Sequence, residues 1–210
     1  MKKNPLKVII LLAPGFEEVE ALTPADYLRR AEIEVCTAAV YNSAGAAGNL
    51  AGIPRLVTGS HDISVIADTA LHELADQGRL EPSFWDAVIV PGGMPGSTNL
   101  AASEQTGEFL KSMAREKKWI FSICAAPAVV LAPLGLLEGR NFTCYPGHEE
   151  KVKGANWRED RVVPDNSPGC FGLITSRGAG TAGEFSAAII AALLSEDAAR
   201  QISEKVLLGV

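Results

Sequence analysis

Short apolar runs alternate with helical patterns along most of this chain. The runs predict strands at Lys7–Leu12, Glu34–Ala39, Asp86–Pro91, Trp119–Ile123 and Gly172–Ser176. Helical patterns follow four of these strands, at Glu17–Ala31, Glu104–Lys117, Ala126–Ala132 and Thr181–Leu194. Because strands that alternate with helices are joined by crossovers, this order predicts an α/β fold with a mostly parallel sheet and helices on both faces.

Three further segments lie between the second and third predicted strands. The apolar runs Arg55–Thr58 and Ile63–Ile66 predict a hairpin or an edge of the sheet. The stretch Tyr41–Gly52 is small and polar, which is typical of an exposed loop rather than of a domain linker. With 210 residues, of which 47% are apolar, the chain has the size and the core of one domain, residues 1–210.

The charge and hydropathy of the chain argue against two kinds of partner. There are 25 acidic and 19 basic residues, and the basic ones are scattered, which argues against nucleic acid binding. The apolar run Val8–Ala13 resembles a secretory signal but leads into Pro14 without a cleavage site. The stretch Ala187–Leu194 is far shorter than the roughly 18 residues of a membrane span. We therefore expect neither nucleic acid nor membrane as a partner.

The four cysteines, at positions 36, 124, 144 and 170, show no spacing of the CxxC kind. Cys36 and Cys124 lie in or beside predicted core strands. Reduced thiols in the cytoplasm are the simplest interpretation.

Cys124 stands where the predicted strand Trp119–Ile123 ends and the helical pattern Ala126–Ala132 begins. A strand-to-helix corner turns a side chain outward and places it beside the free N–H groups of the helix N-terminus, which favours thiolate over thiol. Cys124 is thus a candidate nucleophile. A buried core cysteine is the alternative, since free cysteines are commonly buried.

A glycine-rich stretch, Pro91–Ser97, follows the third predicted strand. It has neither the GxGxxG spacing of a dinucleotide site nor the Lys-Ser/Thr of a phosphate-binding loop. Ligands of open α/β sheets bind at the carboxyl ends of the strands, an edge that this stretch shares with Cys124. Its backbone N–H groups are suited to hold an oxyanion, and a structural turn is the simpler alternative.

Three carboxylates, Glu17, Glu18 and Glu20, open the first predicted helix. Acidic residues in a first helical turn are favoured by the helix dipole, and most are simply solvated. Glu20 differs, because it lies seven and eight positions before Tyr27 and Leu28 and shares their apolar stripe. An inward carboxyl near a thiol has a raised pKa and can move protons.

Four segments, in this order and spacing, resemble the ThiJ/PfpI superfamily, above all the branch of the human parkinsonism-associated protein deglycase and its bacterial relatives. They are Gly15–Glu20, Pro91–Gly93, Ser122–Pro127 and Thr175–Thr181. The resemblance covers nearly the whole chain and implies a flavodoxin-like three-layer α/β sandwich that is usually a homodimer. It also implies a reactive Cys124 at a nucleophile elbow, a hydrogen-bonded Glu20, and the amides of Gly93 and Ala125 around the site. Neither a cofactor nor a metal is implied.

The chain departs from the family pattern near the site. Tyr145 stands where many relatives have a histidine close to the cysteine. His148 either reaches the pocket or, more simply, lies on the surface. His61 stands in the segment where relatives tend to have an arginine, which weakens the anion-binding capacity that the family implies. Cys144 is either a second thiol of the site or a buried bystander.

These observations together predict a cysteine-dependent, cofactor-independent enzyme acting on small reactive carbonyls, of the glutathione-independent glyoxalase or protein deglycase type. Cys124 would be the nucleophile, Glu20 the proton shuttle, and the Gly93 and Ala125 amides the oxyanion donors, with Tyr145 as a hydrogen-bond donor. Two alternatives stay open. One is a redox-responsive stress protein or chaperone with an oxidisable Cys124; the other is a cysteine hydrolase of peptides or amides, which needs a base beside the thiol.

Overall fold

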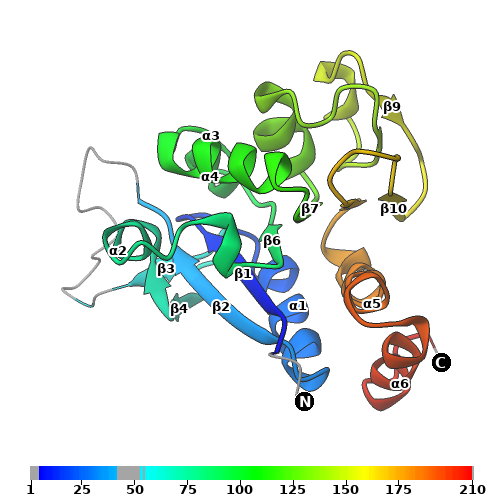
Figure 1. Ribbon diagram of the computed structural model, residues 1–210, viewed down its shortest axis with the longest axis horizontal. Coiled ribbons are helices and arrows are strands. Elements are labelled where there is room, and N and C mark those ends of the chain that lie inside the picture. Colours follow the sequence, from blue (N-terminus) through cyan, green and yellow to red (C-terminus); the bar gives the residue numbers. More distant parts are fainter. Residues whose placement is uncertain (1–4, 42–52, 54, 210) are drawn as a thin grey trace.

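A seven-stranded sheet forms the centre of the computed structural model, which describes residues 5–41, 53 and 55–209 (Figure 1). The strand order is β10-β11-β7-β6-β1-β2-β5, and every neighbouring pair is parallel except β10 with β11. The strands are β1 (Lys7–Leu12), β2 (Glu34–Ala39), β5 (Thr69–Ala70), β6 (Ala87–Val90), β7 (Trp119–Ile123), β10 (Val162–Asp165) and β11 (Leu173–Ser176). The predicted mostly parallel sheet is therefore confirmed.

Helices cover both faces of this sheet (Figure 1). One face carries α1 (Glu18–Arg30), α5 (Ala182–Leu193) and α6 (Glu196–Lys205); the other carries α2 (Leu71–Asp76), α3 (Gly96–Ala101) and α4 (Glu104–Arg115). The side chains of β1 alternate between the two layers: Val8 and Ile10 pack against the first set of helices, and Ile9 and Leu11 against the second. All four are fully buried, as expected for a strand covered on both faces.

The smaller elements lie outside the main sheet. The predicted hairpin is present as the antiparallel pair β3 (Leu56–Thr58) and β4 (Ser64–Ile66). A second small pair, β8 (Asn141–Phe142) and β9 (Asn156–Trp157), is parallel. Beyond Tyr41, the loop expected at Tyr41–Gly52 lies outside the described residues.

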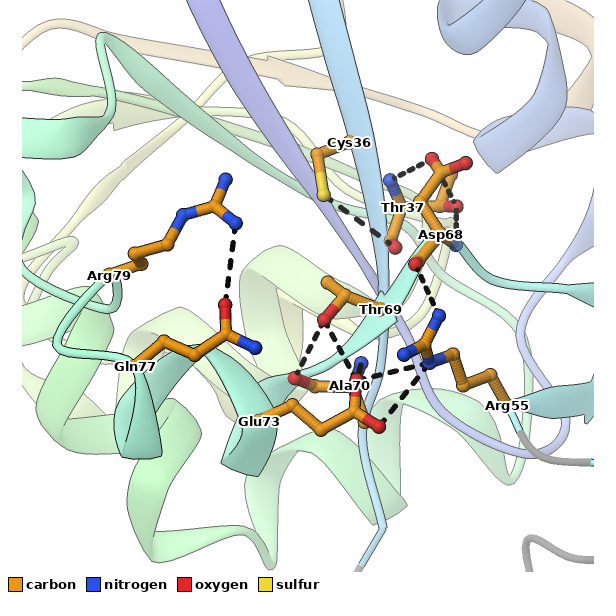
Figure 2. A network of polar contacts seen from close by, with 9 residues as sticks. All are labelled: Cys36, Thr37, Arg55, Asp68, Thr69, Ala70, Glu73, Gln77 and Arg79. Carbon is orange, nitrogen blue, oxygen red and sulfur yellow. Dashed lines mark hydrogen bonds and ion pairs between the residues drawn. The ribbon is translucent and has the colours of Figure 1, made fainter.

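The edge strand β5 is tied to its neighbour by side chains as well as by the sheet (Figure 2). The Asp68 carboxylate accepts hydrogen bonds from the backbone N–H and the hydroxyl of Thr37, at 2.8 and 2.9 Å. Arg55, just before the hairpin, donates to the Asp68 carbonyl and contacts the Glu73 carboxylate. Side chains therefore supply part of the anchoring that a two-residue strand lacks.

The segment after Cys124 is less regular than predicted. A π-helical turn runs over Pro127–Leu131, and a 3₁₀ turn follows at Ala132–Leu134. The Ala132 N–H bonds to the Pro127 carbonyl, five residues back. Pro133 has no N–H to donate to the Val129 carbonyl, so a regular α-helix cannot continue through this segment. Among the described residues, no helix is both long and apolar enough to cross a membrane.

Candidate active site at the Cys124 elbow

Cys124 occupies the left-handed region of backbone space, with a φ of 64°. A residue other than glycine costs about 1–3 kcal/mol there, so the surroundings must hold it. Its N–H donates to the Ser176 carbonyl at 2.9 Å, and its carbonyl accepts from the Tyr145 N–H at 2.8 Å. Both backbone groups are thus fixed, and the thiol stands at the end of β7, partly open to solvent.

The loop after β6 approaches the thiol closely because Gly92 has no side chain. A Cβ atom on Gly92 would lie 2.6 Å from the Cys124 Cβ and 2.6 Å from the Glu20 Oε2. Real Cβ atoms do not come so close to other atoms, so only glycine fits here. The backbone amides of Gly93 and Ala125 hydrogen bond with the sulfur. The structure therefore brings both expected amides to Cys124.

Glu20 is fully buried and hydrogen bonds with the Cys124 thiol. Its Oε2 accepts the Gly92 N–H at 2.9 Å, whereas Oε1 is buried without a nitrogen or oxygen partner among the described residues. Burial raises the pKa of Glu20 to about 7; the bond to Cys124 opposes this rise, and the charge of Glu17 adds to it. Glu20 can therefore gain or lose a proton near neutral pH.

The thiol does not behave as the elbow alone predicted. Burial raises the pKa of Cys124 to about 12, and the negative charge of Glu20 and the hydrogen bond to it act in the same direction. The amides of Ala125 and Gly93 lower the pKa, but by less. The expectation of a free thiolate beside a helix N-terminus is thus wrong while Glu20 is ionised. Cys124 and Glu20 titrate as a coupled pair, and the thiol becomes a nucleophile when Glu20 takes its proton.

The three carboxylates at the start of α1 have three different positions. Glu17 caps the helix, because its side chain accepts the Glu20 N–H at 2.8 Å. Glu18 turns toward the β3–β4 hairpin and accepts the His61 N–H at 2.8 Å. Glu20 faces Cys124, as its place on the apolar stripe predicted. Glu18 is also buried, and the sequence pattern gave no sign of this, since its partners lie more than 40 residues away.

Tyr145 lies beside the elbow through its backbone bond to Cys124, and about half of its surface is exposed. Its ring packs near Gly178, where a Cβ atom would be 3.5 Å from the ring and 3.8 Å from the Glu20 Oε1. Tyr145 thus borders the side on which Glu20 presents its unpartnered oxygen. His148 stands edge-on to the Tyr145 ring, with centroids 6.1 Å apart.

Cys144 is fully buried, and it packs in the core on the opposite face of the sheet from the layer that Cys124 contacts. The buried-bystander interpretation is the one that fits. Two backbone groups that the sequence pattern does not indicate also belong to the site, the Gly92 N–H and the Ser176 carbonyl. Both belong to segments already singled out, but which backbone group meets a given partner depends on how distant segments pack together.

His61 lies against the start of α1. Its Nδ1 is 3.0 Å from the Glu18 Oε2 and 3.9 Å from the Glu17 Oε1. The side chains of Glu17, Glu18 and His61 could each offer one metal ligand, and these three ligand atoms lie within 4.8 Å of one another. No other such group occurs among the residues that the structure describes. The hydrogen bonding of His61 to Glu18 accounts for the arrangement, and we assign no metal. The same pairing leaves His61 a poor substitute for an anion-binding arginine.

Known proteins with similar sequences and structures belong to one family. The model of the DJ-1/PfpI family matches residues 6–192. Protein DJ-1 homolog B of Arabidopsis thaliana is 34% identical over 97% of this chain but only 42% of its own length, so the chain spans less than half of that relative. The Parkinson disease protein 7 homolog of Danio rerio is 33% identical over 96% of this chain and 97% of its own.

A deglycase of Pyrococcus abyssi is 30% identical over 77% of this chain and 87% of its own length. The solved structure of a DJ-1 superfamily protein from Salmonella typhimurium is 34% identical, with a TM-score of 0.82 and coverage of 96% of this chain and 98% of that one. The chain therefore belongs to the DJ-1/PfpI family, and its predicted flavodoxin-like fold is confirmed.

Proposed function

We propose that this protein is a cysteine-dependent enzyme that converts reactive 2-oxoaldehydes such as methylglyoxal to 2-hydroxy acids, without a cofactor. The observation that carries the proposal is the contact between the Cys124 thiol and the buried Glu20 carboxyl, whose pKa is about 7. A base poised near the working pH is what proton transfer at a carbonyl requires. The deglycase name of the Pyrococcus relative supports chemistry on carbonyl adducts.

The reaction begins when the Cys124 sulfur adds to the aldehyde carbon. As the S–C bond forms, the thiol proton passes to the ionised Glu20 and then to the carbonyl oxygen, which gives a hemithioacetal. The Gly93 and Ala125 amides, which face the sulfur, are suited to hold the oxygen while it is negative. Tyr145 borders the same space, and its hydroxyl is a hydrogen-bond donor for the second carbonyl.

Isomerisation then uses Glu20 a second time. Its carboxylate removes the proton from the former aldehyde carbon, which leaves an enediol, and returns a proton to the neighbouring carbon. The product is a 2-hydroxy thioester of Cys124. Water hydrolyses this thioester to the 2-hydroxy acid and restores the thiol, so that substrate and water balance the product.

Lactate formation from methylglyoxal without glutathione tests the proposal. Cys124→Ser should abolish it, and Glu20→Gln should lower the rate by about 10²–10⁴-fold, the usual contribution of general acid–base catalysis. Cys170→Ser, at an exposed cysteine, is the matched control and should leave the rate unchanged. No lactate from wild-type protein whose Cys124 still oxidises readily would contradict the proposal and favour the redox-responsive alternative.

We further propose that the protein acts as a cytoplasmic homodimer. Two apolar side chains of α1, Val19 and Leu22, are exposed, and so are Ile63 and Ile66 on the hairpin that Glu18 binds. Large exposed apolar side chains on two elements that contact each other are suited to an interface, because a partner would remove them from water. A second copy seated here would cover this surface next to the start of α1.

A further inference from the structure

We propose that Glu18 is a positioning residue, which holds the start of α1 so that Glu20 faces Cys124. The proposal concerns the site that the proposed function uses. Its test is the reactivity of the Cys124 thiol toward an alkylating agent, which does not require that the protein turns over a substrate.

The Glu18 carboxylate is almost fully buried, and its hydrogen bonds all come from the turn between β3 and β4. Oε1 accepts the backbone N–H groups of His61 and Ile63, at 2.8 and 3.3 Å. Oε2 accepts from the Ser60 hydroxyl at 3.4 Å and pairs with the His61 ring at 3.0 Å. Burial opposes ionisation, but these hydrogen bonds outweigh it and lower the pKa of Glu18. Gly59 leaves room for this carboxylate, because a Cβ atom at position 59 would overlap it and displace it.

The hairpin needs such an anchor. Its strands have three residues each, and within the described part of the chain they pair only with each other. An isolated two-stranded hairpin is marginally stable in water. Glu18 therefore supplies tertiary contacts that the small sheet lacks.

The hairpin in turn holds the segment that leads into α1. The Gly15 N–H donates to the Thr58 carbonyl at 2.8 Å, and the Ser60 N–H donates to the Phe16 carbonyl at 2.7 Å. On its other side, the same segment bonds to the glycine-rich loop, since the Glu17 N–H donates to the Gly92 carbonyl at 3.0 Å. The segment is thus held between the hairpin and the loop that contacts the thiol.

The connection ends at Glu20. Glu17, the last residue of this segment, caps α1 by accepting the Glu20 N–H. The direction in which Glu20 leaves the helix therefore depends on a segment that the hairpin steadies, and the hairpin depends on Glu18. Glu18 thus acts on the reaction through these contacts, since the hydrogen bonds of its own carboxylate go to the hairpin turn.

The pH dependence of Cys124 alkylation by iodoacetamide, followed by mass spectrometry of its peptide, tests this chain of contacts. Glu20→Gln removes a neighbouring charge and should lower the midpoint by about 1–3 pH units. Glu18→Ala should shift the midpoint in the same direction by at least half as much, and Glu18→Gln by less, because an amide oxygen still accepts two backbone N–H groups. The double variant Glu18→Ala/Glu20→Gln should match Glu20→Gln alone.

Glu73→Gln is the matched control. Its carboxylate anchors the other end of the same hairpin through Arg55 and caps α2 by accepting the Ala70 N–H at 3.0 Å (Figure 2). The contacts to Gly15, Phe16 and Glu18 come from the opposite end of the hairpin, around its turn, and stay in place in this variant. The variant should therefore lose stability without moving the Cys124 midpoint, which separates positioning from general destabilisation.

The proposal would be overturned if the Glu18 variants kept the wild-type midpoint of Cys124 alkylation while Glu20→Gln changed it. It would also be overturned if the shifts of the two single variants added up in the double variant, or if Glu20→Gln did not change the midpoint. If Glu18→Ala does not fold, Glu18→Gln is read in the same way. Absence of methylglyoxal turnover in wild-type protein would contradict the proposed function and leave this result unaffected.

Discussion

At the scale of single residues, the site depends on Glu20, a buried carboxyl whose ionised form destabilises the folded protein. Burial raises the pKa of Glu20 from an ordinary 4.5 to about 7, so its ionised form is disfavoured in the folded protein. Cys124 adds a strained backbone to the same elbow. Both features oppose stability, and both place reactive groups where a carbonyl can reach them.

The stability of the protein should show this cost as a pH dependence. The folded Glu20 binds its proton more tightly than the unfolded chain does, so its contribution is fully present below pH 4.5 and is lost as the pH rises through about 7. The loss amounts to about 3 kcal/mol. The Glu20→Gln variant has no ionisable group at this position, so it does not undergo this loss. The difference in free energy of unfolding between the variant and wild type should therefore shift by about 3 kcal/mol in favour of the variant from mildly acidic to mildly basic pH. Urea denaturation at both pH values measures it, and parallel pH curves for the two proteins would refute the buried charge.

At the scale of elements, a buried ion pair joins β8, β10 and the approach to β11. Arg140 donates to the Asp165 carboxylate at 3.0 Å and to the Phe171 carbonyl at 2.9 Å. The Asn141 N–H donates to the same carboxylate at 2.6 Å. Both charged side chains are at least 95% buried. These bonds hold the antiparallel edge strand β10 against β11, whose last residue, Ser176, accepts the Cys124 N–H.

Arg140→Met should therefore destabilise the fold strongly. It leaves Asp165 as a buried charge without its cation, which costs about 3–5 kcal/mol. Arg30→Met, which removes the exposed partner of Asp26, should leave the free energy of unfolding nearly unchanged, because solvent screens that pair. Chemical denaturation of both variants provides the comparison. Equal and small effects would mean that the Arg140 pair does not hold the edge of the sheet.

At the scale of the whole molecule, the exposed apolar side chains of α1 and the hairpin predict a dimer. Wild-type protein should have about twice the 22.1 kDa of one chain in light scattering. Leu22→Lys should give monomers, because a buried lysine in an interface is unpaired. Leu207→Lys, at an exposed leucine near the C-terminus, is the control and should remain dimeric. A monomeric wild type would contradict the proposed interface.

Across the whole molecule, the elements that can be predicted from the sequence are those whose residue pattern is local. The five main strands are rich in apolar residues and can be recognised from local sequence, whereas β10 contains Pro164 and acquires its strand character by pairing with β11. Helix α6 was missed because only Ala199 and Ile202 are buried along a charged helix. Glu20 was identifiable from a helical stripe. The role of Glu18 was not, since it depends on a turn more than 40 residues away in the chain.

The pH profile of methylglyoxal turnover, measured without glutathione, tests whether Glu20 activates Cys124. Glu20 must be ionised to take the thiol proton, so kcat/KM should rise with pH and level off above a midpoint near 7, the pKa of Glu20. Glu20→Gln should lose this rise along with most of the rate. A flat profile across neutral pH, or the same rise retained in Glu20→Gln, would contradict a role of Glu20 in activating the thiol.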